Sequence, residues 1–247
     1  MCGRYVLALD TGELVPLFGL DVLDERLPGS SYNIAPSQTV PIVVQRRVDG
    51  DDVRALTPAR WGLVPPWAKS LTAGPTPINA RCETVMTSGM FRRAYAKRRA
   101  IVPATGFYER RNTGDKQSYY VHPRAGGVLA FAGLHEAWRL PEDAGWLVST
   151  TIITRPAEGQ MISVHDREPL YLAPDLWDSW LDPDEPGTPD LLDAALSATA
   201  VITDGLDFRP VGGGWLSTRP GFYRTDATLI EPAFFEDMGD VSLSSPS

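Results

Sequence analysis

The sequence has few of the residues that hold metal ions or build disulfide frameworks. Its 247 residues include two cysteines, Cys2 and Cys82, and three histidines, and neither a CxxC nor an HExxH spacing occurs. These absences argue against a zinc site, and we expect no metal ion. The two cysteines could form one disulfide, but in a reducing compartment we expect a reactive thiol on the one that is exposed.

Long hydrophobic runs are missing as well. No apolar stretch of this chain approaches the roughly 20 residues of a membrane span. The first residues also lack the basic and apolar regions of a signal peptide. We therefore expect a cytoplasmic protein with no membrane partner.

Proline and glycine are plentiful instead, with 22 of each spread along the chain without a period. This pattern indicates many short elements joined by turns and disfavours a helical bundle. No repeat or long linker divides the chain, and its length and 43% hydrophobic content suit one domain with a real core. We expect that domain over residues 1–235, a flexible tail over 236–247, and a monomer.

Hydrophobic patterning predicts strands in the middle of the chain and helices at its periphery. The expected strands are 39–45, 99–102, 118–121, 128–134 and 147–153. The expected helices are 12–18 behind a Thr11 cap, 88–97, 174–181 and 189–196. The acidic, proline-rich stretch 181–190 is expected to be a surface loop between two helices.

Acidic residues exceed basic ones, and the formal net charge is -8. The excess is uneven: residues 1–120 hold 16 Lys and Arg against 11 Asp and Glu, whereas residues 121–247 hold 7 against 20. Local potential rather than total charge governs contact with a polyanion. The basic stretch 91–99 is therefore either a phosphate-binding surface or an ordinary solvated helix face.

Cys2 stands directly behind the initiator, in the opening MCGRY. Because the residue is small, we expect an aminopeptidase to remove Met1 and leave cysteine at the terminus. A terminal cysteine carries an amine and a thiol on adjacent carbons, with unperturbed pKa values of roughly 7.7–8.0 and roughly 8.5. Two nucleophiles would then share one exposed residue.

Three further segments combine titratable or amide groups with turn-forming neighbours near the ends of expected strands. They are NARCE at 79–83, PATGFYER at 103–110 and SVHDREP at 163–169. Loops on a rigid scaffold are common positions for catalytic groups. Glu109 and His165 are weak candidates when each is taken alone.

Together with the opening residues, these segments resemble the SRAP (SOS response-associated peptidase) family. Seven motifs carry the resemblance in order: MCGRY, YNIAPSQ at 32–38, WGLVPPW at 61–67, INARCET at 78–84, RRAIVPATGFYE at 98–109, TIITRPA at 151–157 and VHDREPLYL at 164–172. The resemblance implies a protein that protects abasic sites in single-stranded DNA by crosslinking to them, with no cofactor. It also implies an α+β fold: one strand-rich domain with a mixed or antiparallel barrel-like sheet and peripheral helices.

The chemistry suits a terminal Cys2. A neutral amine attacks the open-chain aldehyde of an abasic sugar to give an imine, and the neighbouring thiolate closes a thiazolidine ring. By resemblance, Asn79 helps to place the amine and the sugar. Glu109 resembles the acid that opens the sugar ring and moves protons, and His165 a group that shuttles a proton during imine formation or reversal.

The resemblance also implies the DNA contacts, and nucleoid association of a bacterial protein bound to DNA. Arg4, Arg81 and Arg167 resemble phosphate contacts flanking the lesion. Thr154 is a fainter candidate for a hydrogen bond nearby. Trp67 is expected to stack on a base, whereas Trp61 is expected in the core.

The chain departs from the family pattern at three places. Arg110 stands where the family usually has tryptophan, and Glu168 replaces the usual methionine of its HDRMP motif. Glu168 could weaken the phosphate contact of Arg167 or pair with Arg110. The segment 209–215 also differs from the expected PVS followed by VN, which puts the shape of the groove there in doubt.

Two other functions start from the same residues. N-terminal nucleophile amidotransferases also begin Met-Cys-Gly, and there the thiol attacks a glutamine amide. That family would require an RGPD-like segment and an NG or GD pair, which we do not find in suitable context. The other alternative is an inert DNA-binding module of the same fold.

Overall fold

The computed structural model describes residues 2–71, 74–112, 114–141, 144–217 and 223–233. The strands are β1 (Arg4–Leu7), β2 (Val22–Leu23), β3 (Ser31–Ile34), β4 (Thr39–Val48), β5 (Asp51–Trp61), β6 (Asn79–Arg81), β7 (Arg99–Ala104), β8 (Gly106–Arg110), β9 (Ser118–Pro123), β10 (Leu129–Arg139), β11 (Trp146–Pro156), β12 (Arg167–Pro169) and β13 (Leu206–Val211). The helices are α1 (Thr11–Phe18), α2 (Arg92–Lys97), α3 (Trp177–Leu181) and α4 (Pro189–Asp204), with 3-10 turns η2 (Gly159–Ser163), η3 (Pro174–Leu176), η4 (Gly213–Leu216) and η5 (Ala227–Ile230). The tail expected at 236–247 lies outside the described residues.

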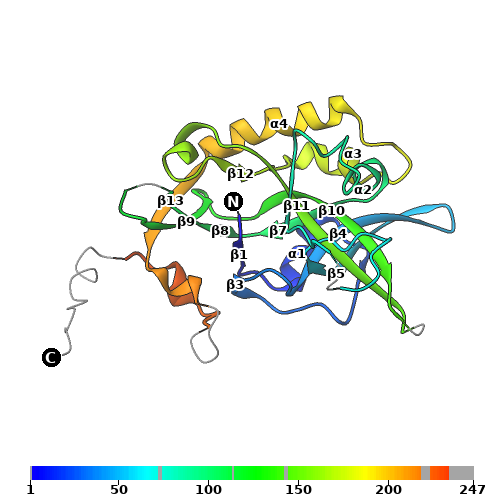
Figure 1. Cartoon of the computed structure of the whole chain (residues 1–247), viewed down its shortest axis with the longest axis horizontal. Coiled ribbons are helices and arrows are strands. Elements are labelled where there is room, and N and C mark those ends of the chain that lie inside the picture. The colour runs from blue at the N-terminus through cyan, green and yellow to red at the C-terminus, as the bar shows by residue number, and fades with distance from the viewer. Residues whose placement is uncertain (1, 72–73, 113, 142–143, 218–222, 234–247) are drawn as a thin grey trace.

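Five strands close into a barrel. They follow the order β5–β4–β7–β10–β11, with antiparallel pairing throughout, and β11 then pairs with β5 in parallel. The parallel closure joins Ser149 to Arg60 and Thr150 to Trp61. The expected strand-rich α+β fold with a barrel-like mixed sheet is confirmed (Figure 1).

The β4–β5 hairpin shows why this part of the sequence folds as it does. β4 is buried continuously from Val40 to Val44, as expected for a strand covered on both faces. Asp49 and Gly50 form its two-residue turn, both with positive φ, at 52° and 96°. This is the backbone of a type I′ turn, whose twist matches that of the flanking strands.

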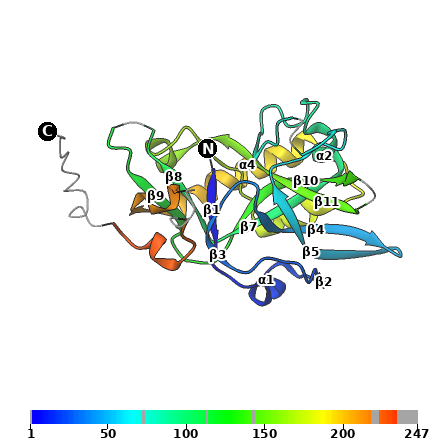
Figure 2. The same ribbon diagram turned by 60° about the horizontal axis from the view of Figure 1, so that its bottom comes forward.

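A second sheet lies against the barrel and carries the start of the chain. Its order is β13–β9–β8–β1–β3, and β1 forms antiparallel pairs with both β8 and β3 (Figure 2). The buried Tyr5 ring anchors β1, because it packs edge-on against Trp61 at 5.2 Å and Phe131 at 6.1 Å between centroids. The barrel core therefore determines where Cys2 stands.

The chain passes from the barrel to the second sheet at Gly106, between β7 and β8. A Cβ at this position would lie 2.5 Å from the Tyr120 ring, so no other residue fits without displacing that ring. The glycine leaves room for the Tyr120 ring of β9, the strand that pairs with β8, and Glu109 comes three residues later on β8.

The helices lie outside the sheets, as expected, with α1 on one side of the barrel and α2, α3 and α4 on the other (Figures 1 and 2). Their bounds differ from the predictions. Asp10 rather than Thr11 caps α1 through a capping box with Glu13, because its carboxylate reaches the Glu13 N–H at 3.0 Å. α2 begins at residue 92 instead of 88, and α4 extends to 204 instead of 196.

None of the described helices is long and apolar enough to cross a membrane.

Candidate functional site

Three segments carry the predicted site residues that lie nearest to the start of the chain. β6 carries Asn79 and Arg81, β8 carries Glu109, and His165 follows η2 and precedes β12. β6 and β12 both pair with β11, so Arg81 lies opposite Thr154 in the register. Residues that are up to 86 positions apart in the sequence are therefore brought together from both sheets, with Asn79 and Arg81 beside β11 and Glu109 beside β1.

Cys2 is buried, which corrects the expectation of an exposed thiol. Its exposed fraction is 0% in the chain that still carries Met1, and it belongs to the hydrophobic core. Burial and the nearby charge of Glu109 raise the pKa of the thiol well above its ordinary range. The thiol is therefore neutral at pH 7 in this structure.

Asn79 contacts the Cys2 backbone directly. Its Nδ2 donates to the Cys2 carbonyl at 3.1 Å. Its Oδ1 is buried and has no hydrogen-bond partner among the described residues. A buried acceptor without a donor is costly, so Oδ1 is free to accept a hydrogen bond from a ligand beside the first residues of the chain.

Glu109 and His165 form the titratable pair of the site. The Nε2 of His165 lies 3.9 Å from Oε1 of Glu109, and both side chains are largely buried. Burial raises the pKa of Glu109, while the charges of the amino terminus and His165 lower it by less. The raised pKa favours the protonated carboxyl form, which can donate a proton.

His165 is held by the backbone on its other side. Its Nδ1 lies 3.0 Å from the N–H of Arg167 and 2.8 Å from Oδ1 of Asp166. A neutral ring can accept from the N–H, and a protonated ring can donate to the carboxylate. Both protonation states therefore have a partner, as a proton shuttle requires.

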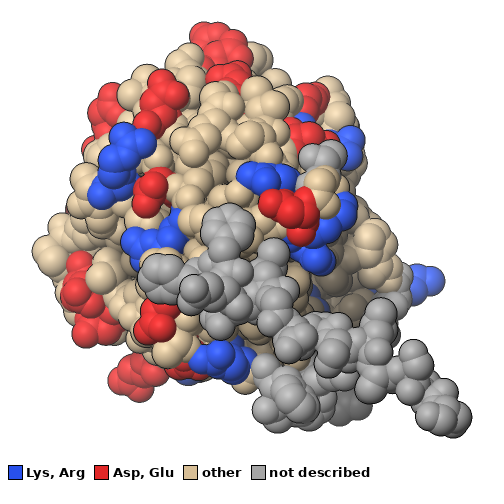
Figure 3. Space-filling view, turned by 90° about the vertical axis from the view of Figure 1, so that its left-hand side faces the viewer, with Lys and Arg blue, Asp and Glu red and all other residues tan. Residues whose placement is uncertain are grey.

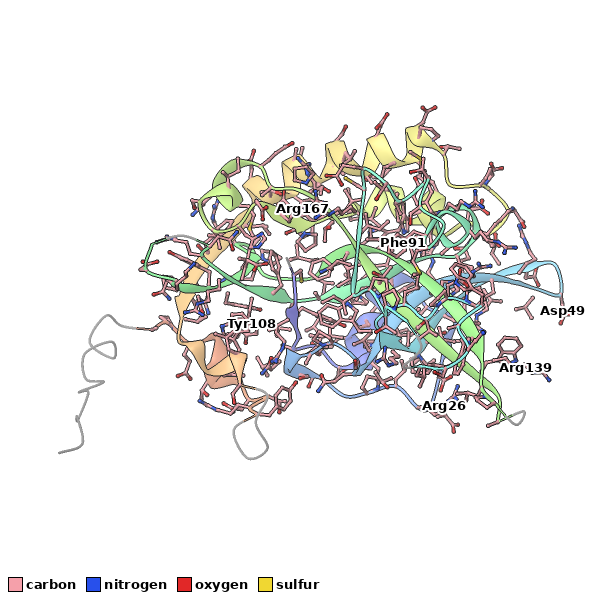
Figure 4. The ribbon with its side chains drawn as sticks, in the orientation of Figure 1. Arg26, Asp49, Phe91, Tyr108, Arg139 and Arg167 are labelled. Atoms are coloured by element: carbon pink, nitrogen blue, oxygen red, sulfur yellow. The ribbon has the colours of Figure 1, made fainter. Side chains whose placement is uncertain are left out.

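Arg167 is bound to the protein rather than free. Its guanidinium makes a two-pronged ion pair with Glu83, in which Nη2 lies 3.1 Å from Oε2. Nη2 also donates to the carbonyl of Thr154 at 2.8 Å and to its hydroxyl at 3.2 Å. Thr154 itself is fully buried, so it reaches the site through Arg167. Figure 4 shows Arg167 beneath α4.

The two other predicted phosphate contacts differ from each other. Arg81 is exposed and has no ion-pair partner among the residues that the structure describes, so it is available to an anion. Arg4 is buried, and its Nη1 donates to Asn33 Oδ1 at 2.8 Å and to the Trp215 carbonyl at 2.6 Å. Within the part of the chain that the structure describes, Nε and Nη2 of Arg4 make no hydrogen bond and are left for the predicted phosphate contact.

The two tryptophans, Trp61 and Trp67, differ in exposure as predicted. Trp61 is fully buried and its indole N–H donates to the Ile78 carbonyl at 3.0 Å. Trp67 is 55% exposed and borders a cavity of about 400 Å³. It is the one of the two whose ring is open to a base.

The suggested pairing of Glu168 with Arg110 is wrong. Glu168 is fully buried, accepts from the Thr203 hydroxyl at 2.9 Å and lies 3.6 Å from Nε of Arg155. Arg110 is exposed, and its Nε donates to the Lys116 carbonyl. Residues 168 and 110 face different parts of the molecule because β12 turns residue 168 toward α4.

The basic stretch 91–99 is structural in part, since Arg98 and Arg99 bind within the protein while Arg92, Arg93 and Lys97 are exposed. Arg99 is buried and donates to five backbone carbonyls, those of Tyr95, Ala96, Trp180, Asp182 and Glu185. Arg98 pairs with the buried Glu136 at 2.7 Å. Only part of the stretch can act as a phosphate-binding surface. Elsewhere basic and acidic side chains are interspersed, as on the face shown in Figure 3.

Glu83 contacts a predicted site residue, Arg167, and was not itself singled out from the sequence. β6 ends at Arg81, and the chain then turns, because the Thr84 N–H donates to the Arg81 carbonyl at 3.1 Å. Glu83 lies inside this turn, and the Cys82 N–H ties the turn to β11 by donating to the Thr154 carbonyl at 2.9 Å. No local pattern identifies Glu83, because its contact with Arg167 joins residues that are 84 positions apart in the sequence.

Within the described ranges, no group of three or more His, Cys, Asp or Glu side chains is arranged to hold a metal ion.

The chain is similar in sequence to known proteins. The profile of the SOS response associated peptidase (SRAP) family matches residues 1–213. The abasic site processing protein YoqW of Bacillus subtilis is 38% identical over 186 residues, which cover 74% of this chain and 81% of YoqW. The abasic site processing protein YedK of Escherichia coli is 33% identical over 190 residues, covering 73% of this chain and 79% of YedK.

Solved structures share the fold. A protein from Bacteroides thetaiotaomicron superposes with a TM-score of 0.74 at 21% identity, covering 94% of this chain and 100% of its own. A phage-related protein from Bordetella bronchiseptica gives a TM-score of 0.62 at 30% identity, covering 85% of this chain and 94% of its own.

Proposed function

Because the chain belongs to the SOS response associated peptidase (SRAP) family, we propose that it processes abasic sites in single-stranded DNA through a covalent bond to Cys2. The names of YoqW and YedK support abasic sites as the substrate class. The observation that carries the proposal is the contact between Asn79 and Cys2, with the titratable pair Glu109 and His165 alongside.

The first step needs a free amine on Cys2, so Met1 must be removed. The neutral amine attacks C1′ of the open-chain sugar, and loss of water leaves an imine. Asn79 supports this step, since its unpaired Oδ1 can accept from the amine or from a sugar hydroxyl. Any residue in front of Cys2 would turn the amine into an amide and stop the reaction.

The thiol acts second. It is neutral rather than ionised, because burial raises its pKa. Its sulfur adds to the imine carbon while its proton ends on the imine nitrogen, so the thiazolidine forms with water as the single product released. The sulfur and the imine carbon belong to one five-membered ring, and proximity favours this closure by several kcal/mol, on the order of effects seen for well-placed intramolecular reactions.

Glu109 and His165 would move the protons. Glu109 has a raised pKa, so its carboxyl form can protonate the sugar ring oxygen and the departing hydroxyl. His165 lies within 3.9 Å of Glu109 and has a partner in either protonation state, so it can return the proton. No step of this route uses a metal or a cofactor.

The DNA would be held on both sides of the lesion. Exposed Arg81 and the less accessible Arg4 and Arg167 would contact phosphates, and Thr154 would act through Arg167. Trp67 would stack on a neighbouring base.

Incubation with a single-stranded oligonucleotide containing one abasic site tests the proposal. The wild type should give an adduct that survives denaturation, and mass spectrometry of the active protein should find Cys2 as its first residue. Cys2→Ala should lose the stable adduct but still form an imine that borohydride traps, because alanine keeps the amine. Cys82→Ala is the matched control, since it removes the other free cysteine and should crosslink normally.

Three results would contradict the mechanism. Retention of Met1 in crosslinking protein would remove its first step, and full-rate crosslinking by Asn79→Ala or Glu109→Ala would remove the roles of those residues. Glutaminase activity would favour the amidotransferase instead. DNA binding without any adduct would favour the inert module.

A further inference from the structure

The two terminal nitrogens of the Arg167 guanidinium already donate hydrogen bonds to other residues of the protein. Nη1 and Nη2 face the two carboxylate oxygens of Glu83, and Nη2 also reaches the carbonyl and hydroxyl of Thr154. The remaining donor, Nε, is buried and has no hydrogen-bond partner among the residues described. The carboxylate of Glu83 therefore takes the same two-pronged position that a phosphate would take.

Glu83 stays ionised under all ordinary conditions. Its hydrogen bonds from Arg167 lower its pKa to about 2, more than partial burial raises it. The pair with Arg167 is consequently neutral as a unit near pH 7. A neutral pair attracts a polyanion less than a free arginine does.

The two partners are not equally buried. The side chain of Glu83 is 44% exposed, whereas that of Arg167 is 12% exposed and is also fastened to β11 through Thr154. Glu83 can therefore rotate into water while Arg167 stays in place. Cys82 adds one contact to Glu83, with its sulfur 3.4 Å from Oε2.

We propose that Glu83 is a specificity-determining residue that occupies the phosphate-binding fork of Arg167 until a correctly placed DNA phosphate displaces it. Intact or poorly placed strands then gain little from Arg167, whereas a strand seated by the lesion at Cys2 can compete for the fork. This inference rests on the proposed function, because it assumes that DNA binds beside Arg167 and Glu83.

The test measures non-covalent binding, so that it does not depend on crosslinking. A fluorescent single-stranded oligonucleotide without an abasic site is titrated with wild type and Glu83→Gln at several salt concentrations. Glu83→Gln should bind roughly threefold to tenfold tighter at low salt, because the variant frees one arginine. The slope of log K against log salt should steepen by about 0.7, as expected for one more phosphate neutralised on a single strand.

Asp24→Asn is the matched control. Asp24 makes the same kind of two-pronged pair with Arg26, and its removal changes the net charge equally. Figure 4 shows Arg26 and Arg167 on opposite sides of the molecule. Asp24→Asn should leave both affinity and slope unchanged, and Arg167→Gln combined with Glu83→Gln should abolish the gain.

Several outcomes would overturn the inference. These are an unchanged or weaker affinity of Glu83→Gln, an equal gain in Asp24→Asn, a gain that persists without Arg167, or no measurable binding by either protein. A parallel assay with abasic DNA separates the two proposals. Failure of the wild type to crosslink would refute the proposed function, whereas normal crosslinking without a gain in Glu83→Gln would refute the role of Glu83 alone.

Discussion

Glu168 provides a quantitative prediction about stability and pH. It is a fully buried carboxyl group that accepts from the Thr203 hydroxyl at 2.9 Å and the Glu158 N–H at 3.2 Å. Burial raises its pKa from 4.5 to about 7, outweighing the hydrogen bond from Thr203 and the charge of Arg155. Glu168 therefore stays protonated in the folded chain at pH values where it ionises in the unfolded chain.

The sign and size of the effect follow from this difference. Between pH 4.5 and about 7 the folded state binds the extra proton, so the free energy of unfolding falls as pH rises through that window. At about 1.4 kcal/mol for each pH unit the upper limit is about 3 kcal/mol. Relaxation of the site around the ionised carboxylate reduces this limit, and we expect about 1–3 kcal/mol.

The perturbation is Glu168→Gln, which keeps the shape of the side chain but removes its proton equilibrium. Urea unfolding at pH 5 and pH 8 gives the free energy of unfolding of each protein. The wild type should lose about 1–3 kcal/mol more than Glu168→Gln between the two pH values. Asp24→Asn is the control, because the pKa of Asp24 is lowered to about 2 and it does not titrate in this range.

An equal pH dependence in wild type and Glu168→Gln would refute the reasoning. So would a wild type that becomes more stable, relative to Glu168→Gln, as pH rises from 5 to 8. That second result would mean that Arg155 and Thr203 stabilise the carboxylate more than burial disfavours it.

Three further predictions concern Arg99, the two tryptophans and the absence of a metal from the proposed route. Arg99→Met should lower the free energy of unfolding in urea by about 3–5 kcal/mol, because it leaves buried carbonyls without a donor; an effect below 1 kcal/mol would contradict the network. Trp61→Ala should lower stability by about 3–5 kcal/mol, whereas Trp67→Ala should leave stability within about 0.5 kcal/mol and weaken binding of single-stranded DNA by about 1–3 kcal/mol. Crosslinking should proceed at an unchanged rate in excess EDTA, and loss of the adduct on chelation would contradict the metal-free route.

Local patterns in the sequence predicted the four described helices and five of the thirteen described strands, but not β1, β5 or β8. The β-branched runs at 39–45 and 147–153 lie within β4 and β11, and the expected helices overlap α1 to α4. Strand ends and caps were less predictable, since they depend on side-chain contacts such as that of Asp10 with Glu13. The order in which the strands close into a barrel is a long-range property that periodicity does not contain.

The candidate site was predicted mainly through ordered motifs. Asn79, Glu109 and His165 lie near the start of the chain as a set, as the resemblance implied. The burial of Cys2 was not predictable, because it depends on how Tyr5 packs between Trp61 and Phe131 and on the neighbouring Glu109. The roles of the predicted residues remain predictions.

By itself, then, the sequence determined which chemical groups are available and which segments form strands and helices, because residue type and local spacing govern both. Only the tertiary structure decided which partners the charged groups have. Arg99 donates to backbone carbonyls, Arg167 forms an ion pair with Glu83, and Glu168 accepts from Thr203 and lies beside Arg155. The reason is physical, since the free energy of a charge depends on its exposure and its neighbours, and residues far apart in the chain supply both.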